Sequence, residues 1–358
     1  MVQPMGFPIY MANTYTPQQA INLVQALAHG IPVDQVKANI CDLINSDMWR
    51  NYPWSWSVAS LTPMNLINGV QDYVYTGAFI SIPLNISQTS PSVNYGGSYP
   101  IALTPNGLSE AASTVTVTTN YAHNLPVGTT TAGVVCTITG AVVAGYNTSL
   151  TITTVPSTTT IVGTIGTSGL AASGAPGTNN ILRMLKLRVA RLDTSPAEYR
   201  ELKMLNNLSP ELTRQGGLDS ITAVVLYGST NTFRLDLAAS VGVGQIMQIQ
   251  GEYQFLPIKI TDATMNTALP FPDQYFNVFM EGVLWQIYRL SDDPRAGSGA
   301  YMINGSQSKT RQGQYAIYQQ ALENMKNIED LGSGDEFMYP EEPLGVGRSF
   351  WPGLFGLS

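Results

Sequence analysis

The sequence predicts an α+β protein: a helical bundle, made of an N-terminal αα-hairpin and two C-terminal helices, with a β-meander and an inserted all-β sandwich or barrel domain. Apolar residues recur at helical spacing near both ends of the chain. Between Asp72 and Arg183 the only formally charged residue is Glu110. Within this nearly uncharged segment, residues 112–167 consist of short β-branched runs split by turn residues, which is typical of a small sandwich or barrel.

The composition favours an assembling protein over a nucleic-acid binder or a membrane protein. Only 11% of the 358 residues are charged, against roughly 25% in soluble domains, so much of the surface is uncharged or contacts other chains. The formal net charge of -7 is opposite to that of most phosphate-binding proteins. No apolar run approaches the roughly 20 residues of a membrane span. The N-terminus lacks the basic start of a secretory signal, so we expect synthesis in a cytoplasm.

The N-terminal region predicts two helices that form an αα-hairpin. In TPQQAINLVQALAHG, residues 16–30, Thr16 is the N-cap, Gln19 completes a capping box and Gly30 ends the helix. A second helix is expected after Pro32. The apolar stripes consist of Ile21, Val24, Leu27 and Ala28 in the first helix and of Val36, Ile40, Leu43, Ile44 and Met48 in the second.

The junction MWRNYPWSW, residues 48–56, holds three of the five tryptophans, namely Trp49, Trp54 and Trp56. A ligand cage would need rings that converge on a gap beside polar or charged groups, and Arg50 is the only charge nearby. Aromatic residues at such a junction mostly cover the end of a core. Packing within the core or between subunits is therefore favoured over ligand binding.

Strands are expected after this junction. SWSVASLTPMNLINGVQDYVYTGAF alternates and turns at Asn68-Gly69, which predicts a hairpin. After Ile181, strands of a meander are predicted by LRMLKLRVARL, ITAVVLYG, TFRLDL and GQIMQIQGEYQFLPI. Between the first two of these, SPAEYRELKMLNNLSPELTRQGG predicts one or two short helices.

Two helices and a tail are expected at the C-terminal end. FPDQYFNVFMEGVLWQIYRL predicts an amphipathic helix that starts near Pro272 and Asp273, and SKTRQGQYAIYQQALENMKNIEDLG predicts another that ends at Gly332. The rest of the chain is too rich in Gly and Pro for a regular element. Its large apolar side chains are costly to leave in water, so the expected partner-binding residues are Phe350, Trp351, Leu354 and Phe355.

These elements predict three domains. A discontinuous helical and β domain covers residues 1–99 and 181–331, and an all-β domain is inserted at residues 100–180. An extended docking tail covers residues 332–358.

The search for catalytic chemistry yields no set of acid, base and nucleophile. His29 and His123 are the two histidines, and each is more typical of a cap or a surface position than of a base. Cys41 and Cys136 lie far apart and are interpreted as buried free thiols. SVGVGQ, residues 240–245, lacks a complete phosphate-loop pattern and is interpreted as a turn. We expect no enzymatic activity, no cofactor and no metal.

Two charge clusters are candidates for contact with a macromolecule. Seven basic residues lie between Arg183 and Arg214 with four interleaved acids, which favours a solvated strand face over a DNA track. Whether Arg183, Lys186, Arg188 and Arg191 face DNA stays open. The second cluster lacks the ligand spacing of a calcium loop, and a solvated acidic tail is favoured over a contact with a basic partner. It consists of Asp330, Asp335, Glu336, Glu341 and Glu342.

Several segments in this order resemble a known family. YPWSWSVASLTPMNLINGVQDYVY, YQFLPIKITD and LPFPDQYFNVFMEGVLWQIYRLSDDPRA, after an N-terminal helical hairpin, resemble the head-to-tail adaptor, or connector, proteins of tailed bacteriophages. In that family, a helix introduced by a proline and an acidic residue packs against the N-terminal helices. The matching parts are residues 14–80 and 181–330. TTNYAHNLPVGT and AGYNTSLTITTVPSTTTIVGT are similar to a small β repeat of phage structural proteins, an insert that simpler adaptors lack.

The resemblance implies a structural virion protein of the neck, made in the host cytoplasm, that connects the portal to the tail. The implied partners are further copies in a homo-oligomeric ring, expected to be a dodecamer, the portal protein, a downstream tail or nozzle protein and, non-specifically, DNA in the channel. The C-terminal tail would grip the portal. The alternative is that residues 100–180 form a tail or surface β module that binds carbohydrate or the host surface. As aromatic platforms it offers only Tyr121 and Tyr146 after Tyr99.

Overall fold

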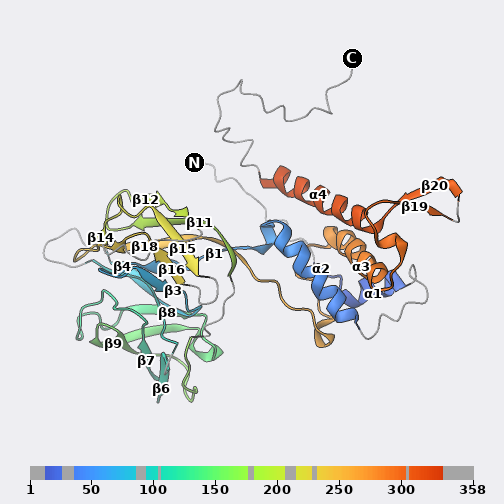
Figure 1. The fold of residues 1–358 in the computed structure, drawn as a ribbon. Helices are drawn as coiled ribbons and strands as arrows, with labels where there is room; N and C mark the ends of the chain where they lie inside the picture. The colour runs from blue at the N-terminus through green and yellow to red at the C-terminus, as the bar shows by residue number, and fades with distance from the viewer. Residues whose placement is uncertain are drawn as a thin grey trace, which may run out of the picture. The chain divides into compact units, whose positions relative to one another are not determined.

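The chain divides into a helical unit, Met1–Ser57 with Pro257–Ser358, and a β unit, Val58–Leu256 (Figure 1). The computed structural model describes residues 13–25, 36–85, 94–103, 106–175, 181–205, 215–227, 232–303 and 306–333. The two ends of the β unit meet, because β1 (Val58–Ser60) pairs with β18 (Met247–Phe255). The β unit is therefore an insertion into the chain of the helical unit.

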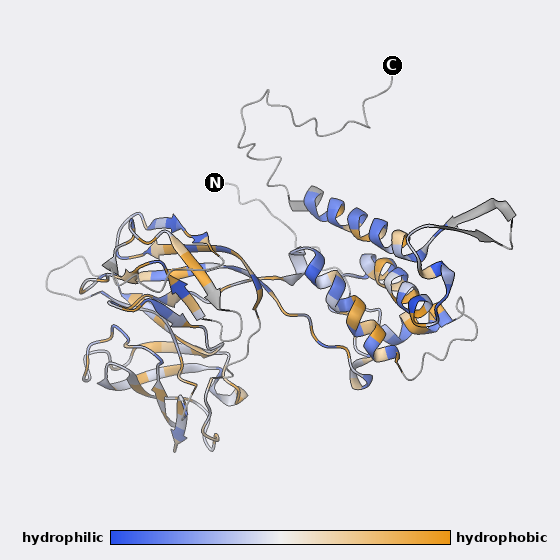
Figure 2. Ribbon diagram, viewed as in Figure 1, coloured by the Kyte–Doolittle hydropathy of each residue, from blue (hydrophilic) through white to orange (hydrophobic). Residues whose placement is uncertain are grey.

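The helical unit is built around α3 (Phe276–Leu290), which contacts α1 (Pro17–Gln25), α2 (Lys37–Asn51) and α4 (Gln314–Ser333). Figure 2 shows strongly hydrophobic residues on α3 and a largely hydrophilic α4, as expected for a central and a covering helix. The buried core includes Ile21, Ile40, Ile44, Met48, Phe279, Val283, Ile287, Tyr318, Leu322 and Met325. Short 3₁₀ turns flank these helices at Ser55–Ser57, Asp262–Thr264, Asp273–Tyr275 and Pro294–Ala296.

The two N-terminal helices follow the sequence prediction at most described positions. The capping box is confirmed, since Gln19 N donates to Thr16 Oγ1 (3.2 Å) and Thr16 N donates to Gln19 Oε1 (2.8 Å). Along α2 the predicted stripe is buried except at Val36 and at Leu43, which is 52% exposed. Leu27, Ala28, Gly30 and Pro32 lie outside the described residues.

The last helix begins later than predicted. Residues 308–312 belong to strand β20 (Ser306–Gln312), which pairs with β19 (Ala300–Ile303). Gly313 separates β20 from α4, and a Cβ on Gly313 would lie 2.0 Å from Gly297 O. The chain therefore approaches itself closely at Gly313, and the helix starts late because residues 308–312 are paired with β19.

The largest sheet lies in the β unit and curls on itself. Its strand order is β5-β4-β8-β9-β10-β7-β6. It curls so that the chain at the end of β5 meets the chain at the end of β7, where Ala102 N donates to Thr118 O (2.9 Å) and Asn120 N donates to Pro100 O (2.8 Å). The strands are β4 (Phe79–Asn85), β5 (Tyr95–Pro100), β6 (Leu108–Ala111), β7 (Thr114–Thr118), β8 (Val135–Thr139), β9 (Ser149–Ser157) and β10 (Thr160–Thr164). A short 3₁₀ turn, Ala144–Tyr146, precedes β9.

Several of the remaining strands of the β unit, among them β11, β15, β16 and β18, contribute to a second hydrophobic core. A five-stranded sheet has the order β1-β18-β11-β12, with β2 (Met64–Asn65) also paired to β18, and a four-stranded sheet has the order β13-β15-β16-β3. Their strands are β11 (Ile181–Arg191), β12 (Glu198–Glu201), β3 (Asp72–Val74), β13 (Lys203–Met204), β15 (Ala223–Tyr227) and β16 (Thr232–Leu235). β14 (Gln215–Gly216) pairs with β17 (Ala238–Ala239).

The predicted hairpin at Asn68-Gly69 is wrong. A turn exists there, with Gly69 at φ 78, but β2 pairs with β18 and β3 pairs with β16. The Tyr73 hydroxyl accepts a hydrogen bond from Ile67 N (3.0 Å) and lies 3.0 Å from Val70 O. A buried tyrosine thus fixes the turn, and the flanking strands enter different sheets.

The predicted fold class, a helical bundle with an inserted β domain, is also wrong. The described residues contain four α-helices against twenty strands, and the large curled antiparallel sheets make this a mostly β molecule. The reason is that the chain on both sides of residues 100–180 is also rich in strands, which join either the seven-stranded sheet or the other sheets of the β unit. Residues 79–100 enter the seven-stranded sheet as β4 and β5.

A second correction concerns residues 195–217, where short helices were predicted. Residues 198–201 form β12, because Arg188, Val189 and Ala190 of β11 pair with Glu201, Arg200 and Tyr199. This pairing overrides the moderate helix propensity of the segment. Residues 206–214 lie outside the described part.

Candidate interaction surfaces

The tryptophans of the junction close one end of the helical core. Trp49 and Trp54 are fully buried, and Trp56 packs partly buried against them. The rings of Trp49 and Trp56 are 4.8 Å apart, edge to face, and those of Trp54 and Trp56 are stacked at 6.0 Å. Trp54 Nε1 donates to Met48 O (2.7 Å). The three rings pack against one another and against Phe271 and Tyr275.

Carboxylates at the end of α4 tie that helix to the junction. The Tyr275 hydroxyl donates to Glu329 Oε1 (2.8 Å), and Ser55 N donates to Glu329 Oε2 (3.1 Å). Burial and the neighbouring Glu329 carboxylate raise the pKa of Tyr275, so its hydroxyl stays a donor. The Tyr52 hydroxyl binds Asp330. The other acids of the predicted cluster, Asp335, Glu336, Glu341 and Glu342, lie outside the described residues.

The basic residues of β11 contact their own sheet. Arg183 Nε donates to Gln254 Oε1 (2.5 Å), and Lys186 lies opposite Glu252 in the ladder. Arg188 Nε donates to Gln250 Oε1 (3.1 Å) while its guanidinium lies 4.5 Å over the Tyr199 ring. Arg191 forms an ion pair with Asp193 at 3.2 Å. These contacts favour a structural strand face over a DNA track.

A polar ladder runs from this face into the unit and was not anticipated from the sequence. Asn65 is 3% exposed, and its amide donates to Gly96 O (2.8 Å) and accepts from Ser98 N (3.2 Å) and Gln248 Nε2 (2.8 Å). Gln250 Nε2 donates to Gln248 Oε1 (3.4 Å), and Gln250 Oε1 in turn accepts from Arg188 Nε (3.1 Å). The ladder joins β2 and β18 of the five-stranded sheet to β5 of the seven-stranded one.

The glycine pair before Ser98 makes room for this ladder. Gly97 has φ 104, and a Cβ there would lie 2.0 Å from Asn65 Oδ1. Gly96 has φ 112, and a Cβ there would lie 2.3 Å from Pro83 O. Gly96-Gly97 inside a strand is the one sequence signal that could have pointed to a close approach.

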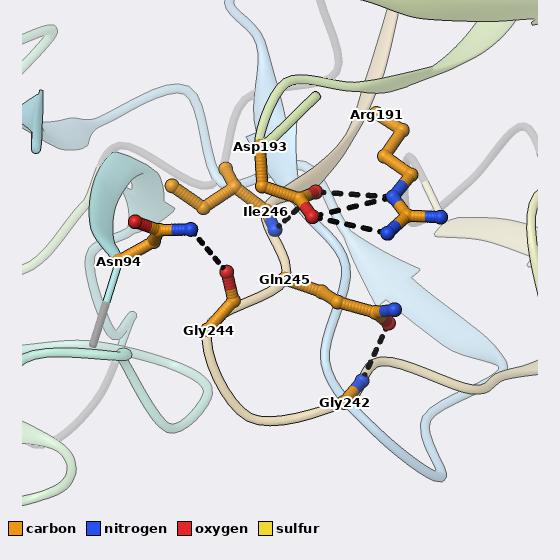
Figure 3. A network of polar contacts seen from close by, with 7 residues as sticks. All are labelled: Asn94, Arg191, Asp193, Gly242, Gly244, Gln245 and Ile246. Atoms are coloured by element: carbon orange, nitrogen blue, oxygen red, sulfur yellow. Dashed lines mark hydrogen bonds and ion pairs between the residues drawn. The ribbon is translucent and has the colours of Figure 1, made fainter. Parts of the chain in front are cut away.

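SVGVGQ is a clamped turn (Figure 3). Gln245 Oε1 accepts from Gly242 N (2.7 Å), and Asn94 Nδ2 donates to Gly244 O (2.8 Å). Behind it, Asp193 Oδ1 accepts from Ile246 N (3.0 Å) and pairs with Arg191. Val243 at the tip is 92% exposed. The contacts drawn in Figure 3 join the turn to side chains of the same unit, and the arrangement is that of a turn held by hydrogen bonds.

The outer face of the seven-stranded sheet is dominated by hydroxyl side chains. Strands β7 to β10 turn most of their apolar residues to the core, with Val135 of β8 exposed. The outward positions include Thr114, Thr116, Thr137, Thr139, Thr153 and Thr164. Tyr99 and Tyr146 are buried. The Tyr121 hydroxyl donates to Asp72 O (3.0 Å) and accepts from Val74 N (2.7 Å) at the edge strand β3. None of these three tyrosines forms an exposed aromatic platform.

Glu110 has a structural position. Its carboxylate accepts from Gly169 N (2.8 Å), Leu170 N (2.9 Å) and Ser113 N. The backbone donors, that of Ser113 foremost, lower the pKa of Glu110. Ser113 has φ 66, so the carboxylate holds a left-handed turn at the end of β6 and β7.

Of the remaining candidates for chemistry, the three that the structure describes are buried. His123 is 5% exposed, its ring lies edge to face with Tyr99 at 6.3 Å, and burial lowers the pKa of the imidazole. Burial raises the pKa of Cys41 and of Cys136 to about 12, so both thiols are protonated and unreactive near neutral pH. His29 lies outside the described residues.

No group of three or more His, Cys, Asp or Glu residues is placed to hold a metal ion within the described ranges. In the same part of the chain, every helix is too short or too polar to cross a membrane. Phe350, Trp351, Leu354 and Phe355 lie outside the described residues. No protein-family model matches the chain, and no curated protein shows significant similarity to it.

Proposed function

We propose that this chain is a structural virion protein, a head-to-tail adaptor whose copies form a ring between the portal and the tail. One observation carries the proposal. Asp273, directly after Pro272, accepts from Thr14 Oγ1 (2.6 Å), Thr14 N (2.8 Å) and Tyr15 N (3.2 Å). The Tyr15 ring stacks on Phe276 at 4.2 Å. A helix introduced by proline and an acid thus packs against the N-terminal helix, which is the arrangement expected from the resemblance to connector proteins.

The chemistry of the chain suits this role. An adaptor works by contact between copies and with its neighbours, and ions at such contacts must lose their hydration. A surface with few charges lowers the free-energy cost of this dehydration. The carboxylates and guanidinium groups described above join segments within the chain. We do not extend the proposal to carbohydrate binding, because Tyr99 and Tyr146 are buried and Tyr121 covers a strand edge.

The proposal is tested by the mass and shape of the purified full-length chain, alone and mixed with the portal protein of the same phage. Light scattering after size exclusion and negative-stain images should show closed rings of several copies. An unrelated protein of similar size, mixed with the same portal, is the control. A chain that stays monomeric and never joins the portal would contradict the proposal.

A further inference from the structure

The hairpin β19–β20 is a separate two-stranded sheet. The strands pair from Ala300 opposite Gln312 to Ile303 opposite Ser306, and neither strand pairs with any other described strand. Figure 1 shows the hairpin projecting beyond the N-terminal end of α4. Two strands alone are at best marginally stable in water, so this hairpin is expected to gain stability from a surface outside its own fold.

The base of the hairpin is held firmly. Gly313 N donates to Gly299 O (2.9 Å) where the two strands return to the helices. Just before β19, the Asp293 carboxylate pairs with Arg295 at 2.6 Å, and the Arg295 guanidinium lies 4.1 Å over the Tyr288 ring of α3. The direction of the hairpin relative to α3 and α4 is therefore set by this base.

The hairpin and the far end of α4 carry opposite charge. Residues 300–312, AYMINGSQSKTRQ, contain Lys309 and Arg311 and no acid, which is a net charge of +2. Residues 322–333 contain Glu323, Glu329 and Asp330 against Lys326, which is a net charge of -2. Residues 314–321 between them carry no charge.

The acidic end of α4, defined here as residues 322–333, also presents a surface. The Glu323 side chain forms an ion pair with Lys326 at 3.3 Å and is still 64% exposed. Ile328 is 54% exposed, and Asn324 and Asn327 are exposed between Glu323 and Ile328. From Gln314 to Glu329 the helix rises about 22 Å, at 1.5 Å per residue. Because the hairpin projects from the opposite end of α4, it points away from the acidic end of its own chain.

We propose that the hairpin of one copy binds the acidic end of α4 of the next copy. This inference rests on the proposed ring. Two different, complementary patches at opposite ends of one helix make a head-to-tail contact, and such a contact closes into a ring when the rotation between copies is suitable. Charge attraction orients the contact, and the exposed Ile328 adds apolar area beside it.

The test is a charge exchange in the full-length chain. One variant carries Lys309→Glu and Arg311→Glu, and the other carries Glu323→Lys and Asn327→Lys, which leaves Glu329 and Asp330 unchanged. Each variant alone should assemble at least tenfold more weakly than the wild type, since like charges meet. A 1:1 mixture should restore assembly, because every contact then joins opposite charges. Light scattering measures both, with the portal present if the wild type assembles only then.

A matched control carries Lys186→Glu and Lys203→Glu, two exposed lysines of the β unit, and should assemble as the wild type does. Circular dichroism and thermal unfolding establish that each variant is folded. The proposed contact would be wrong if the assembly of the hairpin variant keeps the wild-type mass, or if the folded variants do not assemble on mixing. Neither result would contradict the proposed ring. A wild-type chain that never assembles overturns the ring itself and this contact with it.

Discussion

Single buried polar side chains join the sheets of the β unit, and Asn65 is the clearest of them. Replacing Asn65 by Ala removes the acceptor to which both Ser98 N and Gln248 Nε2 donate. Each unpaired buried group costs about 1–3 kcal/mol, so for two groups we expect a loss of about 2–6 kcal/mol in the free energy of unfolding. Urea denaturation measures it. Gln250→Ala, at the less buried end of the ladder, should lower the free energy of unfolding by less than about 1 kcal/mol. Equal losses in the two variants would contradict the proposed role of Asn65 in the ladder.

His123 should make stability depend on pH near neutrality. Burial lowers the pKa of the folded imidazole below 6.5, so the unfolded chain binds the proton more readily. The contribution of the neutral His123 to the free energy of unfolding is fully present above pH 6.5 and is lost as the pH falls through the pKa of the folded state. The melting temperature should therefore drop between pH 7.5 and pH 5.5. His123→Gln should flatten this dependence, and an unchanged profile in that variant would exclude His123 as its source.

Glu110 should act in a separate, more acidic window. Its folded pKa is lowered below 4.5 by backbone donors, so its contribution is present above pH 4.5 and is lost as the pH falls through the lower folded value. Glu110→Gln should be less stable than the wild type at pH 7, and the difference in stability should shrink as the pH falls below 4.5. A constant difference in melting temperature over this range would contradict the assignment.

At the scale of elements, the crossing of three helices depends on Gly282. A Cβ there would lie 2.7 Å from Ile44 Cγ2 of α2 and 2.8 Å from Tyr318 Cε2 of α4. Tyr318 cannot shift easily, because its hydroxyl donates to Asp47 Oδ2 (2.8 Å) and its ring stacks on Trp285 at 5.7 Å.

Gly282→Ala should therefore destabilise the helical unit by about 1–2 kcal/mol, since overpacking outweighs the gain of about 1 kcal/mol in helix propensity. Chemical denaturation followed by circular dichroism measures the change. Asn277→Ala, on the exposed side of the same helix, gains propensity without a clash and should be neutral or slightly stabilising. A stabilised Gly282→Ala variant would show that the helices are not in close contact here.

At the scale of the whole molecule, the helical unit should fold without the β unit. Val58 pairs with Gln254, so the two ends of the β unit are about 5 Å apart at this pair. A chain in which a short Gly-Ser linker replaces residues 58–256 should keep its helical circular dichroism and unfold cooperatively. Because the proposed contact between copies lies within the helical unit, this chain should also assemble. Loss of helical structure would mean that the units depend on each other.

The sequence by itself determined the elements whose signals are local. The capping box of Thr16 and Gln19, the buried stripe of Ile40, Ile44 and Met48, and strands β11 and β18 need only neighbours within a few residues, so periodicity and caps reveal them.

Only the tertiary structure decided which strands pair, and hence that the molecule is mostly β. Residues 198–201 form a strand because they pair with β11. The strands on either side of the Asn68-Gly69 turn enter different sheets, and the Tyr73 hydroxyl holds that turn in place. Asn65 and Gln248, which are 183 positions apart, bond across two strands. Hydrogen bonds between distant residues leave no periodic pattern in the sequence, so only the folded structure identifies which residues pair.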